Sequence, residues 1–197
     1  MFQDHGAFSD PVLESQRAFR GIMNGIARPG SIQSLALNIL SPDGLPVSAA
    51  AAILTLCDFE TALWVCPTIT SADIIADYCA FHTGTMRAKT PDHAQFGLVD
   101  LASNPLKFAD FAQGVAEYPD RSTTLICIVP SLTGGVTRTL SGPGIKTTTQ
   151  FFVEGLPDDF GQHWAANHAS FPLGVDLIFC SGASLVALPR STRIIEN

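Results

Sequence analysis

Charged side chains are scarce in this chain, and lysine is scarcer still. Only 15% of the 197 residues are Asp, Glu, Lys or Arg, whereas 46% are apolar. This composition is compatible with two structures: a large ordinary core, or a molecule whose apolar face is covered by a partner. At this length, about 70% of the surface of the unfolded chain can be buried. No charged, Ser-rich or Pro-rich linker divides the sequence, so we expect a single domain over residues 1–197.

The sequence also lacks clusters of basic residues, which a protein needs in order to contact a phosphate backbone. The chain has three lysines and eight arginines scattered along its length, and its net charge is −7. We therefore expect no nucleic-acid partner. The excess of arginine over lysine is compatible with bidentate recognition of phosphate or carboxylate, but it is also common compositional drift.

Segments that would target the chain to a membrane are absent from the pattern. The residues that begin at Met1 lack the basic start and apolar core of a secretory signal. The longest uncharged stretches are interrupted by Asp58 and Glu60 before they reach the length of a membrane span. We expect a soluble cytoplasmic protein with no membrane partner.

Cysteine pairs with the spacing of metal or redox motifs are missing as well. The five cysteines stand at positions 57, 66, 79, 127 and 180, and no two of them are two to four residues apart. This spacing argues against a zinc knuckle or a thioredoxin-type pair. Four of the five lie in apolar runs, where free Cys behaves as a small hydrophobic residue. We expect reduced, buried thiols.

Catalytic and metal-binding motifs are equally hard to find. The segment Gly142–Lys146 ends like a phosphate loop but lacks the spacing that wraps phosphates in backbone amides. His163 and His168 are five residues apart, whereas a metal pair on a helix needs three or four. No Gly-x-Ser-x-Gly elbow or paired carboxylate is present. We therefore predict no catalytic residue and no metal site from motif chemistry.

Hydrophobic periodicity predicts an α/β protein. Helical patterns alternate with strands early in the chain, and hairpins dominate late, so we expect a three-layer domain with a mixed sheet and helices on its faces. A hairpin is predicted where Thr133-Gly134-Gly135 follows a strong β run. The expected helices are 11–28, 49–56, 71–83, 105–111 (with Asn104 as cap) and 159–167, and the expected strands are 32–37, 62–66, 96–99, 123–129, 136–140, 175–180 and 185–188.

The last of these hairpins carries the most informative polar residues. Two apolar runs are joined by Ser181-Gly182-Ala183-Ser184, and Asp176 interrupts the first of them. A buried carboxylate is costly unless a cation pairs with it or it reaches the end of the sheet. Arg190 and Arg193 follow the second run, so we expect an ion pair of Asp176 with one of them. An alternative is that Asp176 orients the two arginines toward an anionic ligand.

Seven segments, in order along nearly the whole chain, are distinctive when taken together. They are Ala18-Phe19-Arg20-Gly21-Ile22-Met23, Arg28-Pro29-Gly30-Ser31-Ile32, Ile53-Leu54-Thr55-Leu56-Cys57-Asp58, Phe81-His82-Thr83, Leu140-Ser141-Gly142-Pro143-Gly144-Ile145, Phe171-Pro172-Leu173-Gly174-Val175-Asp176 and Leu188-Pro189-Arg190-Ser191-Thr192. In this order they resemble a known family, the H subunit of bacterial carbon–phosphorus lyase (PhnH). The resemblance covers about residues 12–195 and is weakest between residues 147 and 169.

The resemblance implies a fold like the large domain of pyridoxal-phosphate-dependent transferases, used without the cofactor. It implies a role beside the G, I and L subunits in transferring a phosphonate to the ribose of ATP, giving ribose 1-phosphonate 5-triphosphate. The implied partners are the G, I and J subunits, with a homodimer in isolation, and ATP is a substrate of the whole complex. Within the matching segments, the candidates for substrate or partner contact are Arg20, Arg28, Asp176, Arg190 and Arg193.

Two other functions remain compatible with the sequence. One is a free-standing ATP- or phosphonate-binding transferase that uses Asp176, Arg190 and Arg193. The other is a cofactor-dependent transferase, for which Lys146 is the lysine to examine as a Schiff-base residue. The resemblance favours an accessory subunit with no complete active site of its own.

Overall fold

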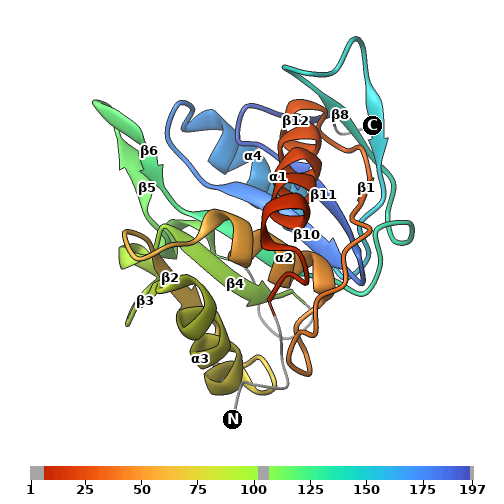
Figure 1. Ribbon diagram of the computed structural model, residues 1–197. Coiled ribbons are helices and arrows are strands. Elements are labelled where there is room, and N and C mark those ends of the chain that lie inside the picture. Colours follow the sequence, from red (N-terminus) through yellow and green to blue (C-terminus); the bar gives the residue numbers. More distant parts are fainter. Residues whose placement is uncertain (1–6, 102–106, 196–197) are drawn as a thin grey trace.

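A seven-stranded mixed sheet lies at the centre of the computed structural model, which describes residues 7–101 and 107–195 (Figure 1). The predicted α/β class with a mixed sheet is confirmed. The strand order is β1-β11-β10-β7-β4-β2-β3, and the members are β1 (Gln33–Ser34), β2 (Ala62–Val65), β3 (Met86–Arg87), β4 (Phe96–Asp100), β7 (Thr124–Ile128), β10 (Asp176–Ser181) and β11 (Ser184–Leu188).

Most strands of this sheet run in the same direction. The strands β10, β7, β4, β2 and β3 run parallel, whereas at one edge β11 pairs antiparallel with both β10 and β1. The central strands β7 and β10 read as continuous apolar runs because both of their faces are covered. Thr124 and Asp176 are register partners at the start of these two strands. Asp176 therefore stands at the end of the sheet rather than in its middle.

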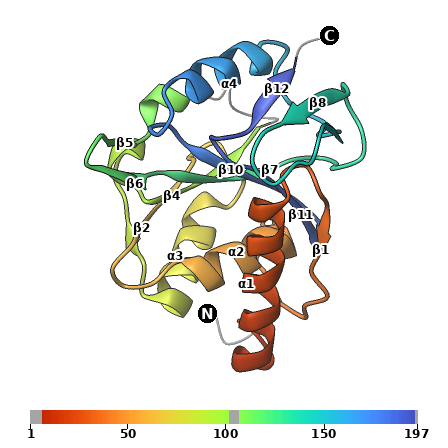
Figure 2. The same cartoon turned by 90° about the horizontal axis from the view of Figure 1, so that it is seen from above.

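Helices cover both faces of this sheet (Figure 2). On one face lie α1 (Pro11–Ala27), α2 (Val47–Leu56) and α3 (Ala72–Thr83). On the other lies α4 (Phe160–Ala169), beside a small antiparallel sheet with the order β12-β8-β9. The three strands of this sheet are β8 (Arg138–Ser141), β9 (Thr149–Phe151) and β12 (Arg193–Ile195). The C-terminal strand thus returns to the α4 side of the molecule.

Local signals place the ends of α1 and α3 to within one residue, whereas α2 begins two residues earlier and α4 ends two residues later than expected. The Asp10 side chain accepts a hydrogen bond from the Leu13 amide at 3.1 Å, and Pro11 occupies the first helical position of α1. At the end of α3, Gly84 adopts φ +73°, a left-handed conformation that glycine reaches without strain. Ser71 stands at the N-cap position of α3 but makes no side-chain capping bond.

The predicted hairpin between β7 and the run 136–140 is wrong. Both edges of β7 are occupied by parallel partners, β4 and β10, so no edge remains for an antiparallel return. The chain instead leaves the large sheet through the loop that contains Gly134 and Gly135, and β8 pairs with β9 and β12. Turn glycines signal a change of direction, but they do not identify the strand that will be met next.

Other boundaries also differ from the pattern. The expected strand 32–37 is reduced to Gln33–Ser34, and the expected strand 123–129 begins and ends one residue inside its predicted limits. Asn104 and the first part of the helix expected at 105–111 lie outside the described residues. The remainder forms a single 3-10 turn, Phe108–Asp110. A second such turn (Pro91–His93) and the hairpin of β5 (Gln113–Val115) with β6 (Tyr118–Ser122) were not predicted.

The core is one contiguous apolar cluster that draws on helices and strands from Ala18 to Leu188. All five cysteines are buried in it or beside it, and none of them forms a disulfide, as predicted. Desolvation raises the pKa of Cys79 and of Cys180 to about 12, which keeps both thiols protonated at neutral pH. No helix within residues 7–101 and 107–195 combines the length and apolarity that crossing a membrane requires.

Candidate functional site at the C-terminal hairpin

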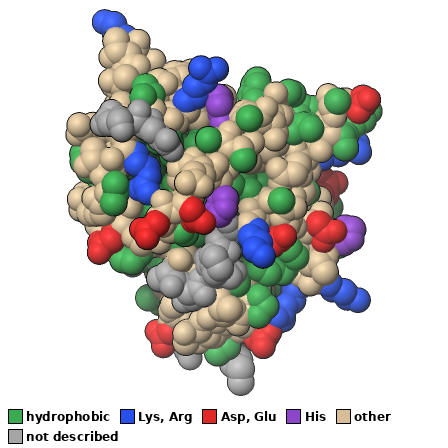
Figure 3. All heavy atoms as spheres, turned by 180° about the vertical axis from the view of Figure 1, so that it is seen from behind, with side chains coloured by type: hydrophobic (Ala, Val, Ile, Leu, Met, Phe, Trp, Pro, Cys, Tyr) green, Lys and Arg blue, Asp and Glu red, His purple; other side chains and the backbone are tan. Residues whose placement is uncertain are grey.

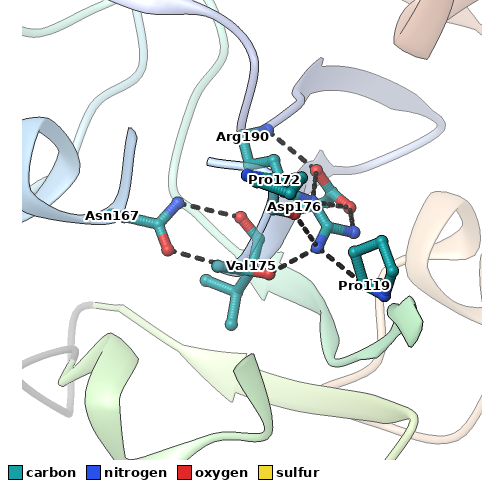
Figure 4. A network of polar contacts seen from close by, with 7 residues as sticks. Pro119, Asn167, Pro172, Val175, Asp176 and Arg190 are labelled. Atoms are coloured by element: carbon teal, nitrogen blue, oxygen red, sulfur yellow. Dashed lines mark hydrogen bonds and ion pairs between the residues drawn. The ribbon is translucent and has the colours of Figure 1, made fainter. Parts of the chain in front are cut away.

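Asp176 and Arg190 form a bidentate ion pair where β10 begins and β11 has just ended (Figure 4). Arg190 Nη2 lies 2.6 Å from Asp176 Oδ2, and Arg190 Nε lies 3.1 Å from the same oxygen. The Arg190 backbone amide also donates to Asp176 Oδ1 at 2.8 Å. The side chain of Arg190 is 16% exposed and that of Asp176 is 27% exposed, so water screens the pair only partly. The predicted ion pair across the hairpin is confirmed for Arg190.

The second terminal nitrogen of Arg190 is also occupied. Arg190 Nη1 donates to the carbonyl oxygens of Gly174 at 2.8 Å and Pro119 at 3.0 Å, with Pro172 at 3.4 Å (Figure 4). One guanidinium thus ties together the loop before β10, strand β6 and the hairpin. With both sides of its fork engaged in this way, Arg190 stabilises the fold and has little capacity left for a ligand.

A second set of hydrogen bonds, made by a residue of α4, holds the same loop. Asn167 Nδ2 donates to the Val175 carbonyl at 3.0 Å, and Asn167 Oδ1 accepts from the Val175 amide at 2.9 Å (Figure 4). Gly174, at φ +113°, permits this approach, because a Cβ there would stand 2.8 Å from Asn167 Oδ1. Asn167 was not predicted as a functional or structural residue. A polar side chain near the end of a helix and a glycine before a strand are too common to signal the pairing.

Of the two arginines predicted as possible partners of Asp176, Arg190 forms the pair and Arg193 does not. Arg193 Nε donates instead to His168 Nε2 at 2.9 Å, while His168 Nδ1 lies 2.8 Å from the Arg190 carbonyl oxygen. Both residues line a cavity of about 360 Å³, which we call the basic cavity. Its lining includes Ser141, Gly142, His168, Phe171, Ser191 and Arg193.

Arg20 lies in α1 and Arg28 at its C-terminal end. This helix covers the opposite face of the sheet from α4 (Figure 2), and neither arginine lines the basic cavity. Arg20 lines a separate cavity of about 340 Å³ with Phe19, Thr55 and two polar residues of α1. Arg28 is the C-cap of α1, and its backbone amide donates to the Asn24 carbonyl at 3.0 Å. The structure therefore groups only Asp176, Arg190 and Arg193 of the five predicted residues.

The other titratable residues that the sequence analysis considered lie at positions with a structural explanation. His163 lies 3.7 Å from Asp159, one turn earlier along the chain, and lines a cavity of about 570 Å³ on the other side of α4. His82 occupies the last turn of α3, as predicted. Lys146 is exposed in the loop between β8 and β9. Among the residues that the structure describes, no three His, Cys, Asp or Glu side chains gather closely enough to hold a metal ion.

The mixed sheet, the ion-paired hairpin and the adjoining basic cavity together define the class: an α/β protein whose polar residues concentrate around its C-terminal hairpin. The chain belongs to the PhnH family of bacterial phosphonate metabolism proteins, whose family model matches residues 6–195. The match covers all the elements that build the hairpin and the cavity.

Two curated relatives agree with this assignment. The chain is 41% identical to the alpha-D-ribose 1-methylphosphonate 5-triphosphate synthase subunit PhnH of Rhizobium meliloti over 189 residues, which are 96% of this chain and 94% of the relative. It is 31% identical to a putative C-P lyase subunit protein, HtxG, of Stutzerimonas stutzeri over 179 residues, or 91% and 85% of the two chains. The resemblance that the sequence motifs indicated is confirmed.

Proposed function

We propose that this chain is an accessory subunit of a bacterial alpha-D-ribose 1-methylphosphonate 5-triphosphate synthase, acting in phosphonate catabolism. The observation that carries the proposal is the 41% identity, over nearly the full length of both chains, to a relative that bears this subunit name. The family match over residues 6–195 supports the same role. In this role the chain works with G, I and L subunits to transfer a phosphonate to the ribose of ATP.

The proposed partners are the G, I and J subunits, with a homodimer when the chain is isolated. An apolar stripe on the exposed surface of α1 supports an interface of this kind. Val12, Phe19, Met23 and Ile26 recur at helical spacing and are 36% to 68% exposed, whereas a second stripe that includes Ala18 and Ile22 is buried. Apolar side chains grouped on one helix face are typical of a surface that a protein partner covers.

The proposal includes further expectations about the cofactor, nucleic acid, the fold, the domain and the location of the chain. The chain carries no cofactor of its own, ATP being a substrate of the complex, and it has no nucleic-acid partner; Figure 3 shows acidic and basic side chains interspersed on the face drawn. The fold corresponds to the pyridoxal-phosphate transferase large domain, which the seven-stranded mixed sheet supports. Residues 1–197 act as one domain in the cytoplasm, and the single apolar cluster supports one domain.

Co-purification tests the assignment directly. The tagged chain, co-expressed with the G, I and J subunits of its own organism, is expected to elute with them as one complex in size-exclusion chromatography. If the three other subunits assemble while this chain elutes alone, the proposed role is wrong. Co-expression with an unrelated tagged α/β protein of similar size controls for nonspecific retention.

Activity assays separate the accessory role from the two alternatives. The purified chain alone is expected to release no adenine from ATP in the presence of methylphosphonate, and turnover by it would establish a free-standing transferase. Incubation with pyridoxal phosphate is expected to give no imine absorbance that disappears in Lys146→Ala. A Lys146-dependent band would instead identify a cofactor-dependent enzyme.

A further inference from the structure

We infer that the basic cavity is a binding site for the phosphoryl or phosphonyl group of a small-molecule ligand. The identity of that ligand as a substrate or product of phosphonate transfer rests on the proposed function. The anion-binding chemistry itself rests on the charges and hydrogen bonds of the cavity. The site is separate from the Asp176–Arg190 pair, whose polar atoms already serve the hairpin.

The first argument is an uncompensated positive charge. No acidic side chain lines the basic cavity, and Arg193 forms no ion pair within the described part of the chain. The nearby carboxylate of Asp176 is already bound by Arg190. Among the described residues, only the Nε of Arg193 is engaged, so its two terminal nitrogens keep their N–H donors for a ligand. Guanidinium groups bind phosphate through such paired donors.

The second argument is that His168 holds Arg193 in place without neutralising it. Because a guanidinium nitrogen only donates, His168 Nε2 must accept the 2.9 Å bond from Arg193 Nε. The proton of the neutral ring then lies on Nδ1, which donates to the Arg190 carbonyl at 2.8 Å. The histidine is therefore a positioning residue that fixes the side chain of Arg193 and leaves its charge intact.

The third argument is the presence of hydroxyl donors beside this charge. Ser141 and Ser191 both line the basic cavity. In the described residues neither side chain forms a hydrogen bond with another protein group. Ser141 is the register partner of Arg193 between β8 and β12, and Ser191 lies two residues before Arg193, so the backbone itself brings these groups together. A guanidinium with two hydroxyls forms a donor set that suits the oxygens of a phosphate or phosphonate.

The walls of the cavity are fixed by backbone contacts. Trp164 Nε1 donates to the Thr192 carbonyl at 2.9 Å, and the Thr192 amide donates to the Pro189 carbonyl at 2.8 Å. Gly142 approaches the same turn so closely that a Cβ there would lie 3.0 Å from the Ser191 carbonyl oxygen. Binding to such a preorganised site costs little conformational entropy. The exposed ring of Phe171 forms an apolar wall for the organic part of the ligand.

Titration calorimetry at low ionic strength tests the site, with the full chain and three probes: inorganic phosphate, methylphosphonate and ATP. At least one probe is expected to bind, and Arg193→Gln is expected to weaken its binding about tenfold to a hundredfold, because hydrogen bonds to a charged group are lost. Arg193→Lys keeps the charge but loses the fork and the bond to His168, so an intermediate affinity is expected.

Arg17→Gln is the matched control, since it removes the same charge from an exposed position near the middle of α1, outside the cavity. It is expected to change the affinity by less than about twofold. The probe that binds identifies the source of the anion. If none binds at millimolar concentration, or if Arg17→Gln weakens binding as much as Arg193→Gln, the inference is wrong. Co-purification with the other subunits is read separately, so failure of the site and failure of the proposed function are distinguishable.

Discussion

At the Asp176 carboxylate, a backbone amide and a guanidinium take the place of water. The two oxygens accept from the Arg190 amide and from Arg190 Nε and Nη2. Each charge of this partly buried pair depends on the other, because little water reaches either side chain and removing one group leaves its partner without an opposite charge. The energetic value of the pair is therefore best measured by removing one charge and keeping the shape.

Asp176→Asn is expected to lower the free energy of unfolding by about 2 kcal/mol or more, because it leaves the partly buried Arg190 guanidinium uncompensated. Asp73→Asn is the matched control. It removes the same charge from the exposed pair of Asp73 with Arg87, which is expected to contribute no more than about 1 kcal/mol. Urea unfolding followed by circular dichroism measures both. Equal losses in the two variants would show that the hairpin pair is no stronger than a surface contact.

The buried thiols predict a loss of stability at alkaline pH. Burial raises the pKa of Cys79 and Cys180 from 9.0 to about 12, and it raises the pKa of Cys57 and Cys127 too. Above about pH 9 the unfolded chain therefore releases protons that the folded chain keeps, so stability falls as the pH rises. Each such thiol contributes a slope of about 1.4 kcal/mol per pH unit.

Urea midpoints under reducing conditions, measured between pH 8 and pH 10.5, test this dependence. The midpoint is expected to fall through this range, and Cys180→Ala is expected to make the fall shallower because one raised pKa is removed. A midpoint that stays constant to pH 10.5 would contradict the protonated state of these thiols in the folded chain.

At the scale of elements, Gly144 connects the small sheet to the first helix. It adopts φ +82° in the loop after β8, and a Cβ there would stand 2.2 Å from the Ala27 carbonyl oxygen at the end of α1. Backbone atoms cannot give way as the end of a side chain can. The loop that borders the basic cavity is thus seated directly on the C-terminus of α1.

Gly144→Ala is expected to lower the free energy of unfolding by about 3 kcal/mol or more, since the costs of the left-handed conformation and of the backbone clash add together. Gly182→Ala is the control, because Gly182 also has a positive φ, +54°, but no atom lies within 4 Å of its added Cβ. In that variant the free energy of unfolding is expected to fall only by the cost of the left-handed conformation, about 1–2 kcal/mol. Chemical denaturation compares them, and equal losses would mean that the loop is not packed tightly on α1.

These two glycines also show how far sequence reasoning reaches. Gly182 was predicted as a turn residue of the C-terminal hairpin, and the ends of α1 were predicted from Asp10-Pro11 and Pro29-Gly30, because such signals act within a few residues. The contact of Gly144 with Ala27 joins residues far apart in the chain, and no local pattern encodes it. The wrong partner for β8 has the same cause, since which strand it meets depends on edges occupied elsewhere.

The candidate site, too, could be predicted from the sequence only in part. The charge inside an apolar strand led to the pair of Asp176 with Arg190, because an unpaired buried carboxylate is costly wherever it stands. The choice between Arg190 and Arg193 depended on how the chain turns after β11, which the sequence does not specify. Asn167 and His168 come from α4, and only the tertiary packing of that helix brings them to the hairpin.

At the scale of the whole molecule, the two stripes of α1 have different roles. Ala18 and Ile22 are fully buried against the rest of the core, whereas Phe19 and Met23 are 49% and 42% exposed. Periodicity alone predicted the helix but could not say which apolar residues would stay outside. The exposed stripe supports the proposed partner interface, which corresponds to the second of the two structures that the composition of the chain allowed.

Replacing Phe19 and Met23 together by serine is therefore expected to convert a dimer of the isolated chain into a monomer, because the apolar contact that drives association is removed. Multi-angle light scattering after size-exclusion chromatography gives the mass. Val136→Ser is the matched control, since Val136 is 67% exposed on the loop between β7 and β8 and lies off this stripe. It should leave the mass unchanged. A double variant that folds and remains dimeric, or a parent chain that is already monomeric, would show that α1 does not hold two copies together.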